Sequence, residues 1–344
     1  MSKKWHFILF ITIGSVLLFL VLLYLSLDRQ KVPVHVKAKL NSLKMIVGQP
    51  FQQNISSSVL LKNLNIVKIE MSNFDKISLK GMLYNQETNN SIYDQKIENI
   101  TFQAGNEYST ILLSGKMKIS EFSADEGTEI SISPKLHLKS IGSSIIRITL
   151  GDTIEILWEE CILSGETEFS DGDSFFTPHL PLLEVGNTNG INQFFVTTKA
   201  EEVVMLEKEI PIQHLDFMKK SFDTSSPILT TSILEAEIIF PTFRGEGIYK
   251  FPEGSYLKIG SFENFILKNT IINQNDNTLS TIVYGYTDDV QAAYGLGEFT
   301  QLLPPSLIIL WRNITLVVIF IIMVWFIKTT TNIYNQWREW GSKE

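Results

Sequence analysis

The stretch that decides the fold is Ile130–Leu150, with the sequence ISISPKLHLKSIGSSIIRITL. Apolar and polar residues alternate strictly within it in three short runs, Ile130–Ser133, Leu136–Lys139 and Ile146–Leu150. Because successive side chains of a β-strand point to opposite faces, this pattern predicts strands with one buried and one solvated face. The stretch is therefore typical of an antiparallel sheet that covers a core on one side.

The same pattern extends through the middle of the chain. Ile77–Lys80 alternates strictly, and Val59–Met71 carries Leu, Ile and Val at close intervals. Only Ala200–Lys208 and His214–Lys220 could form helices, and both would be short. Five further strands, separated by short turns, are expected to form a meander: Ile233–Phe240, Gly247–Phe251, Tyr256–Ile259, Phe265–Ile272 and Leu279–Tyr286. The predicted fold is all-β, built of antiparallel sandwich-like or barrel-like modules.

Two apolar segments of 21 residues flank this β-rich region. Phe7–Leu27 carries no charge, and Leu307–Ile327 carries one, Arg312. A helix of this length spans about 30 Å, the thickness of the hydrocarbon core of a bilayer. The sequence therefore predicts two transmembrane helices. The first is expected to be an uncleaved signal-anchor, because Tyr24 stands where a cleavage site needs a small residue.

Basic residues near the second segment predict its orientation. No Lys or Arg lies between Lys268 and Arg312, whereas three follow the segment: Lys328, Arg338 and Lys343. Such residues favour the cytoplasmic side. Basic residues around the first segment would instead place the middle of the chain in the cytoplasm. Long domains, however, cross membranes largely regardless of charge, so the second segment is given more weight. We therefore expect both termini in the cytoplasm and residues 28–306 outside it, at a plasma or inner membrane.

Proline usage indicates two subregions in the middle of the chain. No proline occurs from Phe51 to Ser133, and seven lie between Pro134 and Pro252. The predicted organisation is a cytoplasmic start (1–6), a first membrane helix (7–27), two β-rich subregions (33–155 and 156–304), a second membrane helix (307–327) and a cytoplasmic amphipathic tail (328–344).

Charge and cysteine content exclude some classes of function. Residues 1–39 carry six basic and one acidic side chain, and residues 305–344 carry four basic and two acidic ones. Residues 40–304 therefore hold the remaining 19 basic and 34 acidic side chains. So acidic a region repels nucleic acid. Cys161 is the one cysteine, so no intrachain disulfide can form. Because Glu159 and Glu160 precede it, its thiol pKa should be raised, and a structural role is expected.

Candidate sites for chemistry are few. Four acidic residues around one turn are weak candidates for a metal site, and a solvated turn is the favoured interpretation: Glu166, Glu168, Asp171 and Asp173. The five histidines form no metal-binding motif, and His137 is expected to be exposed on a strand. No cofactor is expected. Paired aromatics could line a sugar or peptide groove, but core positions are favoured for them: Phe175 and Phe176, Phe194 and Phe195, Tyr249 and Phe251, Tyr284 and Tyr286.

Residues near the membrane could form a partner interface. Trp311 should lie at the outer interface, and Arg312 either reaches the headgroups or pairs with a partner helix. Trp337 and Trp340 share a helical face with Ile333, which suits an interfacial anchor or a docking helix.

We therefore expect a membrane-anchored, non-enzymatic component of a cell-envelope complex, acting in assembly, sensing or scaffolding. Its predicted partners are the lipid bilayer and either a membrane protein or a second copy of the chain, with no nucleic acid. Two alternatives remain open from the sequence. One is an envelope hydrolase or carbohydrate-processing enzyme whose acids converge only in the folded chain, and the other is an accessory subunit of polysaccharide or substrate export.

Overall fold

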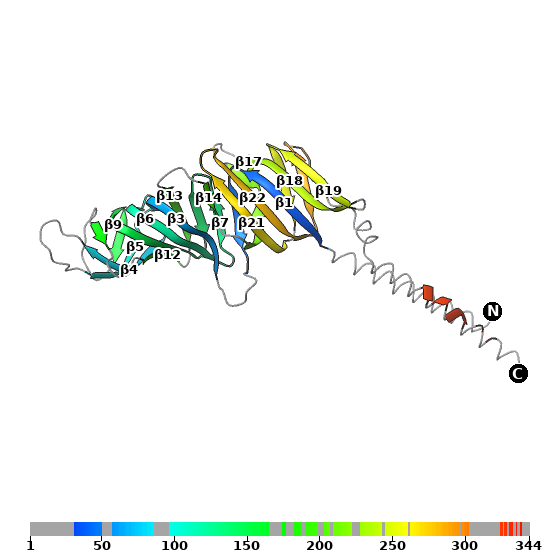
Figure 1. Cartoon of the computed structure of the whole chain (residues 1–344), viewed down its shortest axis with the longest axis horizontal. Helices are drawn as coiled ribbons and strands as arrows, with labels where there is room; N and C mark the ends of the chain where they lie inside the picture. Colours follow the sequence, from blue (N-terminus) through cyan, green and yellow to red (C-terminus); the bar gives the residue numbers. More distant parts are fainter. Residues whose placement is uncertain are drawn as a thin grey trace. The chain divides into compact units, whose positions relative to one another are not determined.

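A computed structural model describes residues 31–49, 57–85, 96–164, 174–176, 182–187, 190–198, 203–206, 209–221, 228–242, 245–260, 262–295 and 297–302, with single positions between 324 and 338. These residues are almost entirely β-strand (Figure 1). Among them, no helix combines the length and apolar character needed to cross a bilayer. The predicted membrane segments Phe7–Leu27 and Leu307–Ile327 lie wholly or almost wholly outside the described residues, so both stay predictions.

The strands follow one another closely along the chain. Three of them, β3, β6 and β9, have 16 residues each. Their bounds are β1 Val32–Leu40, β2 Leu43–Val47, β3 Ser57–Ser72, β4 Lys76–Asn85, β5 Lys96–Ala104, β6 Thr110–Asp125, β7 Glu129–Ile132, β8 His137–Ile141, β9 Ser144–Glu159, β10 Cys161–Ser164, β11 Ser174–Phe176, β12 Leu182–Asn187, β13 Ile191–Thr198, β14 Val203–Met205, β15 Ile210–Asp216, β16 Met218–Ser221, β17 Ile228–Thr231, β18 Ile233–Thr242, β19 Gly245–Pro252, β20 Ser255–Ile259, β21 Glu263–Asn273, β22 Thr278–Thr287, β23 Val290–Tyr294 and β24 Thr300–Gln301.

In the described part of the chain, 19 strands belong to one sheet. β1 pairs with both β18 and β22, and the pairing continues as β22–β21–β15–β2–β7–β8–β13–β3–β6–β9–β12–β4–β5–β10. Each strand pair with a defined register is antiparallel. The prediction of an antiparallel β fold is confirmed in part: the described residues are mostly β-strand and form a large antiparallel sheet, whereas the sandwich-like or barrel-like modules stay a prediction.

The stretch Ile130–Leu150 forms most of β7, all of β8 and the first part of β9, as its alternation predicts. Ile146 and Ile148 are fully buried, while Arg147 and Thr149 between them remain partly exposed. The inner face continues across neighbouring strands, where Leu183 of β12 and Leu79 of β4 are also buried. The buried face of the sheet is therefore a continuous apolar layer, and its stability comes mainly from removing that layer from water.

Two predictions of secondary structure are wrong. Ala200–Lys208 and His214–Lys220 are not helices where the structure describes them: Val203–Met205 is β14, and His214–Lys220 contains the end of β15 and most of β16. Pairing of β14 and β15 with β21 outweighs their weak helical preference. All five strands of the predicted C-terminal meander form, as β18 to β22, and β21 pairs with β22 as expected. The continuous meander is wrong, because β20 pairs with β23, and β23 with β24, in a separate small sheet.

The chain divides into two compact units. Pro33–Ile239 and Ile248–Gln301 form the unit that holds every site described below. The second unit, Met1–Val32 with Phe240–Gly247 and Leu302–Glu344, lies mostly outside the described residues. Strands on either side of residue 155 pair with each other, as β12 does with β9 and β4. The subregion boundary at 155/156 stays a prediction.

Candidate functional site

The site residues predicted from sequence lie outside the described residues. These are the four acidic residues Glu166, Glu168, Asp171 and Asp173, and the interface residues Trp311, Arg312, Trp337 and Trp340. Within the described ranges, no three His, Cys, Asp or Glu side chains converge as metal ligands would. The candidate site therefore has to be built from other residues.

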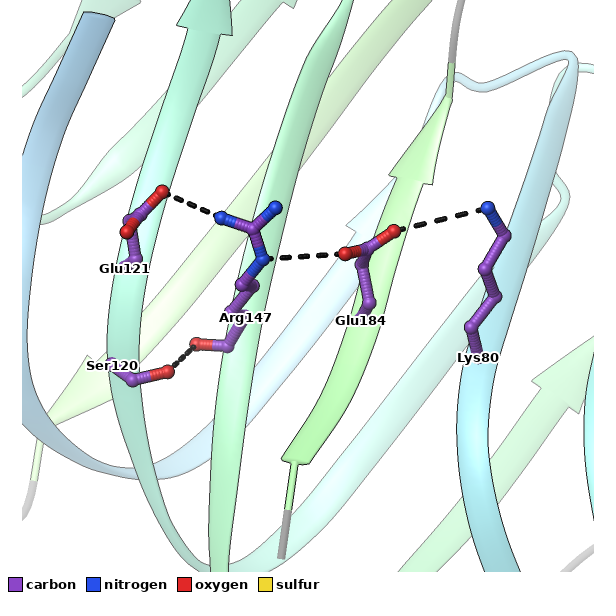
Figure 2. A network of polar contacts seen from close by, with 5 residues as sticks. All are labelled: Lys80, Ser120, Glu121, Arg147 and Glu184. Carbon is purple, nitrogen blue, oxygen red and sulfur yellow. Dashed lines mark hydrogen bonds and ion pairs between the residues drawn. The ribbon is translucent and has the colours of Figure 1, made fainter. Parts of the chain in front are cut away.

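A ladder of alternating charge crosses four neighbouring strands on the outer face of the sheet (Figure 2). Arg147 on β9 donates from one terminal nitrogen to Glu121 on β6 at 2.7 Å, and from its Nε to Glu184 on β12 at 3.2 Å. Lys80 on β4 lies 3.8 Å from the other oxygen of Glu184. Each side chain of the ladder lies directly opposite the next one in the strand registers: Glu121 opposite Arg147, Arg147 opposite Glu184, and Glu184 opposite Lys80.

A β-bulge brings Glu121 into this ladder. Between the pairs Ile119–Ile148 and Glu121–Arg147, β6 has one more residue than β9, and that residue is Ser120. The Ser120 hydroxyl donates to the Arg147 backbone carbonyl at 2.8 Å, which holds the extra residue in place. Because both carboxylates of the ladder contact cations, the ladder links the outer faces of β6, β9, β12 and β4.

A different surface forms on strands β18, β1, β22 and β21. His35 on β1 lies opposite Ile239 on β18, and its ring stacks on Tyr284 of β22 with centroids 4.3 Å apart. Tyr284 lies opposite Ile266 of β21, and Tyr286 follows two residues later on the same strand face. We call Ile239, His35, Tyr284, Ile266 and Tyr286 the aromatic stripe.

The aromatic stripe reaches solvent on strands of the large sheet. Tyr284 and Tyr286 are 41% and 45% exposed, and the other three members are partly exposed. Interface cores are enriched in Tyr and other aromatic residues, which offer large contact areas at a low cost in side-chain entropy. A run of such residues on the outer face of a sheet is therefore suited to binding.

Charged pairs border the aromatic stripe. Lys37 contacts Glu237 at 3.4 Å, and Lys268 contacts Glu209 at 2.7 Å. The Lys268 ammonium also lies 5.5 Å from the centroid of the Tyr284 ring, within reach of a cation–π interaction. The hydrogen bond between Lys268 and Glu209 lowers the pKa of the carboxyl and raises the pKa of the ammonium. Both groups thus stay charged at neutral pH, and the stripe has the apolar centre and polar rim of a recognition surface.

A second histidine–aromatic stack lies on β8 and β13. His137 is opposite Phe195, with ring centroids 3.9 Å apart, and its Nε2 lies 3.3 Å from Gln193 Oε1. His137 is half-buried rather than exposed, so burial lowers its pKa. The neutral ring packs flat on Phe195, which extends the apolar surface of this part of the sheet.

Cys161 begins β10 and is partly buried. Burial raises the pKa of its thiol to about 11, and the charge of Glu160 contributes less. The Sγ atom lies 3.1 Å from the Glu159 carbonyl, to which it can donate. The predicted rise in pKa is confirmed, although its main cause is burial and not the neighbouring carboxylates.

The paired aromatics divide between core and surface. Phe194 and Phe251 are buried, as expected of core residues, but Phe195 and Tyr249 beside them are 40% and 36% exposed. For Tyr284 and Tyr286, the favoured core position is wrong. Sequence reasoning placed both on one strand face but missed His35 and Lys268, which come from other strands. The side chains of Phe175 and Phe176 lie outside the described set.

No model of a protein family, no curated protein and no solved structure matches this chain. The aromatic stripe is therefore interpreted from its own geometry.

Proposed function

We propose that this chain is a non-enzymatic, membrane-anchored component of a cell-envelope complex, and that it binds a protein partner through the aromatic stripe. The partner is a membrane protein or a second copy of the chain. The observation that carries this proposal is the exposure of Tyr284 and Tyr286 on one strand face, where the Tyr284 ring stacks on His35.

The arrangement of carboxylates supports binding rather than catalysis. The glutamates of the charge ladder and of the stripe rim each contact a cation on a neighbouring strand or loop. Such pairs link neighbouring strands, whereas a hydrolase needs a carboxyl group placed to give a proton to its substrate. The stripe offers no proton donor of that kind and instead offers flat aromatic area.

The two apolar segments supply the rest of the proposal. If Phe7–Leu27 and Leu307–Ile327 span the bilayer as helices, the β-rich region lies between them on the extracytoplasmic side, as sandwich-like or barrel-like modules. A domain tethered at both ends stays close to the bilayer, where a partner that is itself in the membrane is at high effective concentration.

Purification of the full chain in a mild detergent tests the proposal. We expect a defined complex, measured as a mass above that of one chain by light scattering after gel filtration. The double substitution Tyr284→Ser and Tyr286→Ser should shift the complex to the mass of the single chain, because it removes the exposed aromatic area of the stripe.

Tyr108 provides a matched control. It is 72% exposed in the turn between β5 and β6, outside the stripe, so Tyr108→Ser should leave the complex intact. Thermal unfolding of each variant would show whether the substitutions disturb the fold. A monomeric wild-type chain, or a complex that survives the double substitution unchanged, would contradict the proposal.

A further inference from the structure

A second group of exposed aromatic side chains lies where β19 meets the small sheet of β20, β23 and β24. Tyr294 ends β23 and is 61% exposed, and its hydroxyl donates to the Lys250 carbonyl of β19 at 3.4 Å. Phe299 precedes β24 and is 44% exposed. Tyr249, next to Lys250, is 36% exposed. We call Tyr249, Tyr294 and Phe299 the C-terminal patch.

Local contacts hold Tyr294, the central residue of the C-terminal patch, in place. The Tyr294 ring stacks on the buried ring of Phe251, with centroids 5.8 Å apart. The backbone N–H of Gly297 donates to the Tyr294 carbonyl at 3.4 Å across the turn that leads to Phe299. Tyr249 and Tyr294 are therefore exposed on strands β19 and β23, and Phe299 is exposed directly before β24.

The length of the chain indicates what covers this patch. Only five residues separate Gln301, the end of β24, from Leu307, the start of the second apolar segment. At about 3.5 Å per residue, a fully extended chain holds Phe299 within about 28 Å of that segment. At the other end, four residues separate Leu27, the last residue of the first apolar segment, from Val32, the first residue of β1. Leu27 and Val32 therefore lie at most about 18 Å apart. Both links confine this unit to the vicinity of the bilayer.

We propose that the C-terminal patch rests on the lipid headgroup layer and fixes the orientation of the β-rich region on the membrane. This inference depends on the proposed membrane anchoring, but not on the aromatic stripe or its partner. Tyrosine suits this position, because its ring enters the apolar boundary while its hydroxyl stays hydrated. The acidic balance of residues 40–304 disfavours anionic lipids. The surface recognised is therefore that of a zwitterionic bilayer.

Spin labelling of the full chain in phosphatidylcholine nanodiscs tests this contact. Cys161 is first replaced by Ser, and single cysteines are introduced at three positions. Glu298→Cys places a nitroxide inside the patch without removing an aromatic ring. Glu107→Cys serves as an exposed turn control, and Val317→Cys reports from the apolar segment. The measured quantity is the accessibility of each label to an aqueous nickel reagent relative to oxygen.

We expect the label at 298 to be protected from nickel compared with the label at 107, and the label at 317 to be protected most. Adding Tyr294→Ser and Phe299→Ser should abolish the protection at 298 and leave the label at 317 unchanged. If nickel reaches the label at 298 as readily as the label at 107, while the label at 317 is protected in the bilayer, the contact of the patch with lipid is refuted and the membrane anchoring stands. A water-exposed label at 317 would refute the anchoring itself.

Discussion

Arg147 offers the sharpest test of how the outer face of the sheet is held together. The substitution Arg147→Met keeps most of the side-chain volume but removes the guanidinium that lies between Glu121 and Glu184. The carboxylates of Glu121 and Glu184, on the two strands that flank β9, would then lose the cation that lies between them. The remaining cation, Lys80, reaches only Glu184, at 3.8 Å.

The size of the effect follows from the exposure of the side chains. Arg147, Glu121 and Glu184 are 35%, 27% and 28% exposed. An exposed ion pair contributes about 0–1 kcal/mol, whereas breaking a fully buried one costs about 3–5 kcal/mol. For a network between these limits we expect a loss of about 2 kcal/mol in the free energy of unfolding. In a domain of this size, that loss lowers the melting temperature by about 5 °C.

Thermal unfolding of the full chain in detergent, followed by circular dichroism, measures this shift. Restoring charge balance with Glu121→Gln and Glu184→Gln in the Arg147→Met background should recover most of the loss. Lys135→Met, at an exposed position outside the ladder, serves as the matched control. If Arg147→Met and Lys135→Met melt at the same temperature, the ladder does not stabilise the fold and the reasoning is refuted.

Three further predictions concern single residues. Because burial lowers the pKa of His137 below 6.5, the unfolded chain takes up this proton first as the pH falls. Stability should therefore decrease below about pH 6.5. Melting curves at pH 7.5 and 5.5 should show a smaller decrease for His137→Phe than for the wild-type chain. An equal decrease in the two proteins would contradict the prediction. A Cβ atom on Gly285 would overlap the buried Phe265 ring, so Gly285→Ala should destabilise the chain by about 1–3 kcal/mol in urea unfolding; an unchanged midpoint would be the opposing result. With its thiol pKa raised to about 11 from 9.0, Cys161 should have about a hundredfold smaller ionised fraction at pH 8 than an unperturbed thiol. It should react with a maleimide far more slowly than a cysteine introduced at Glu107, and equal rates would contradict the prediction.

Strict alternation made much of the fold predictable. The runs in Ile130–Leu150 form β7, β8 and β9, and Phe265–Ile272 and Leu279–Tyr286 lie within β21 and β22. The burial of one face is encoded locally in such runs, because each side chain's face follows from its neighbours. The pairing order is not encoded in this way, since β1 pairs with β18 about 200 residues later. The continuous meander failed in the same way, since β20 pairs with β23 and not with its neighbours in sequence.

The candidate site was less predictable than the strands. That Tyr284 and Tyr286 share a face follows from their spacing, but their exposure depends on whether another layer covers that face. His35 and Lys268 reach Tyr284 only through the registers of three strands and a bulge in β21 near Lys268. The charge ladder is similar, because the glutamates that contact Arg147 are 26 and 37 residues away in the chain.

Sidedness of the two links to the apolar segments tests the central claim most directly. In a chain with Cys161→Ser, single cysteines at Lys31, Gln301 and Lys343 can be treated with a membrane-impermeant maleimide in cells with an intact plasma or inner membrane. If both termini lie in the cytoplasm, cysteines at 31 and 301 react at once, and the cysteine at 343 reacts only after permeabilisation. Labelling of 343 in intact cells, with 31 and 301 protected, would contradict it.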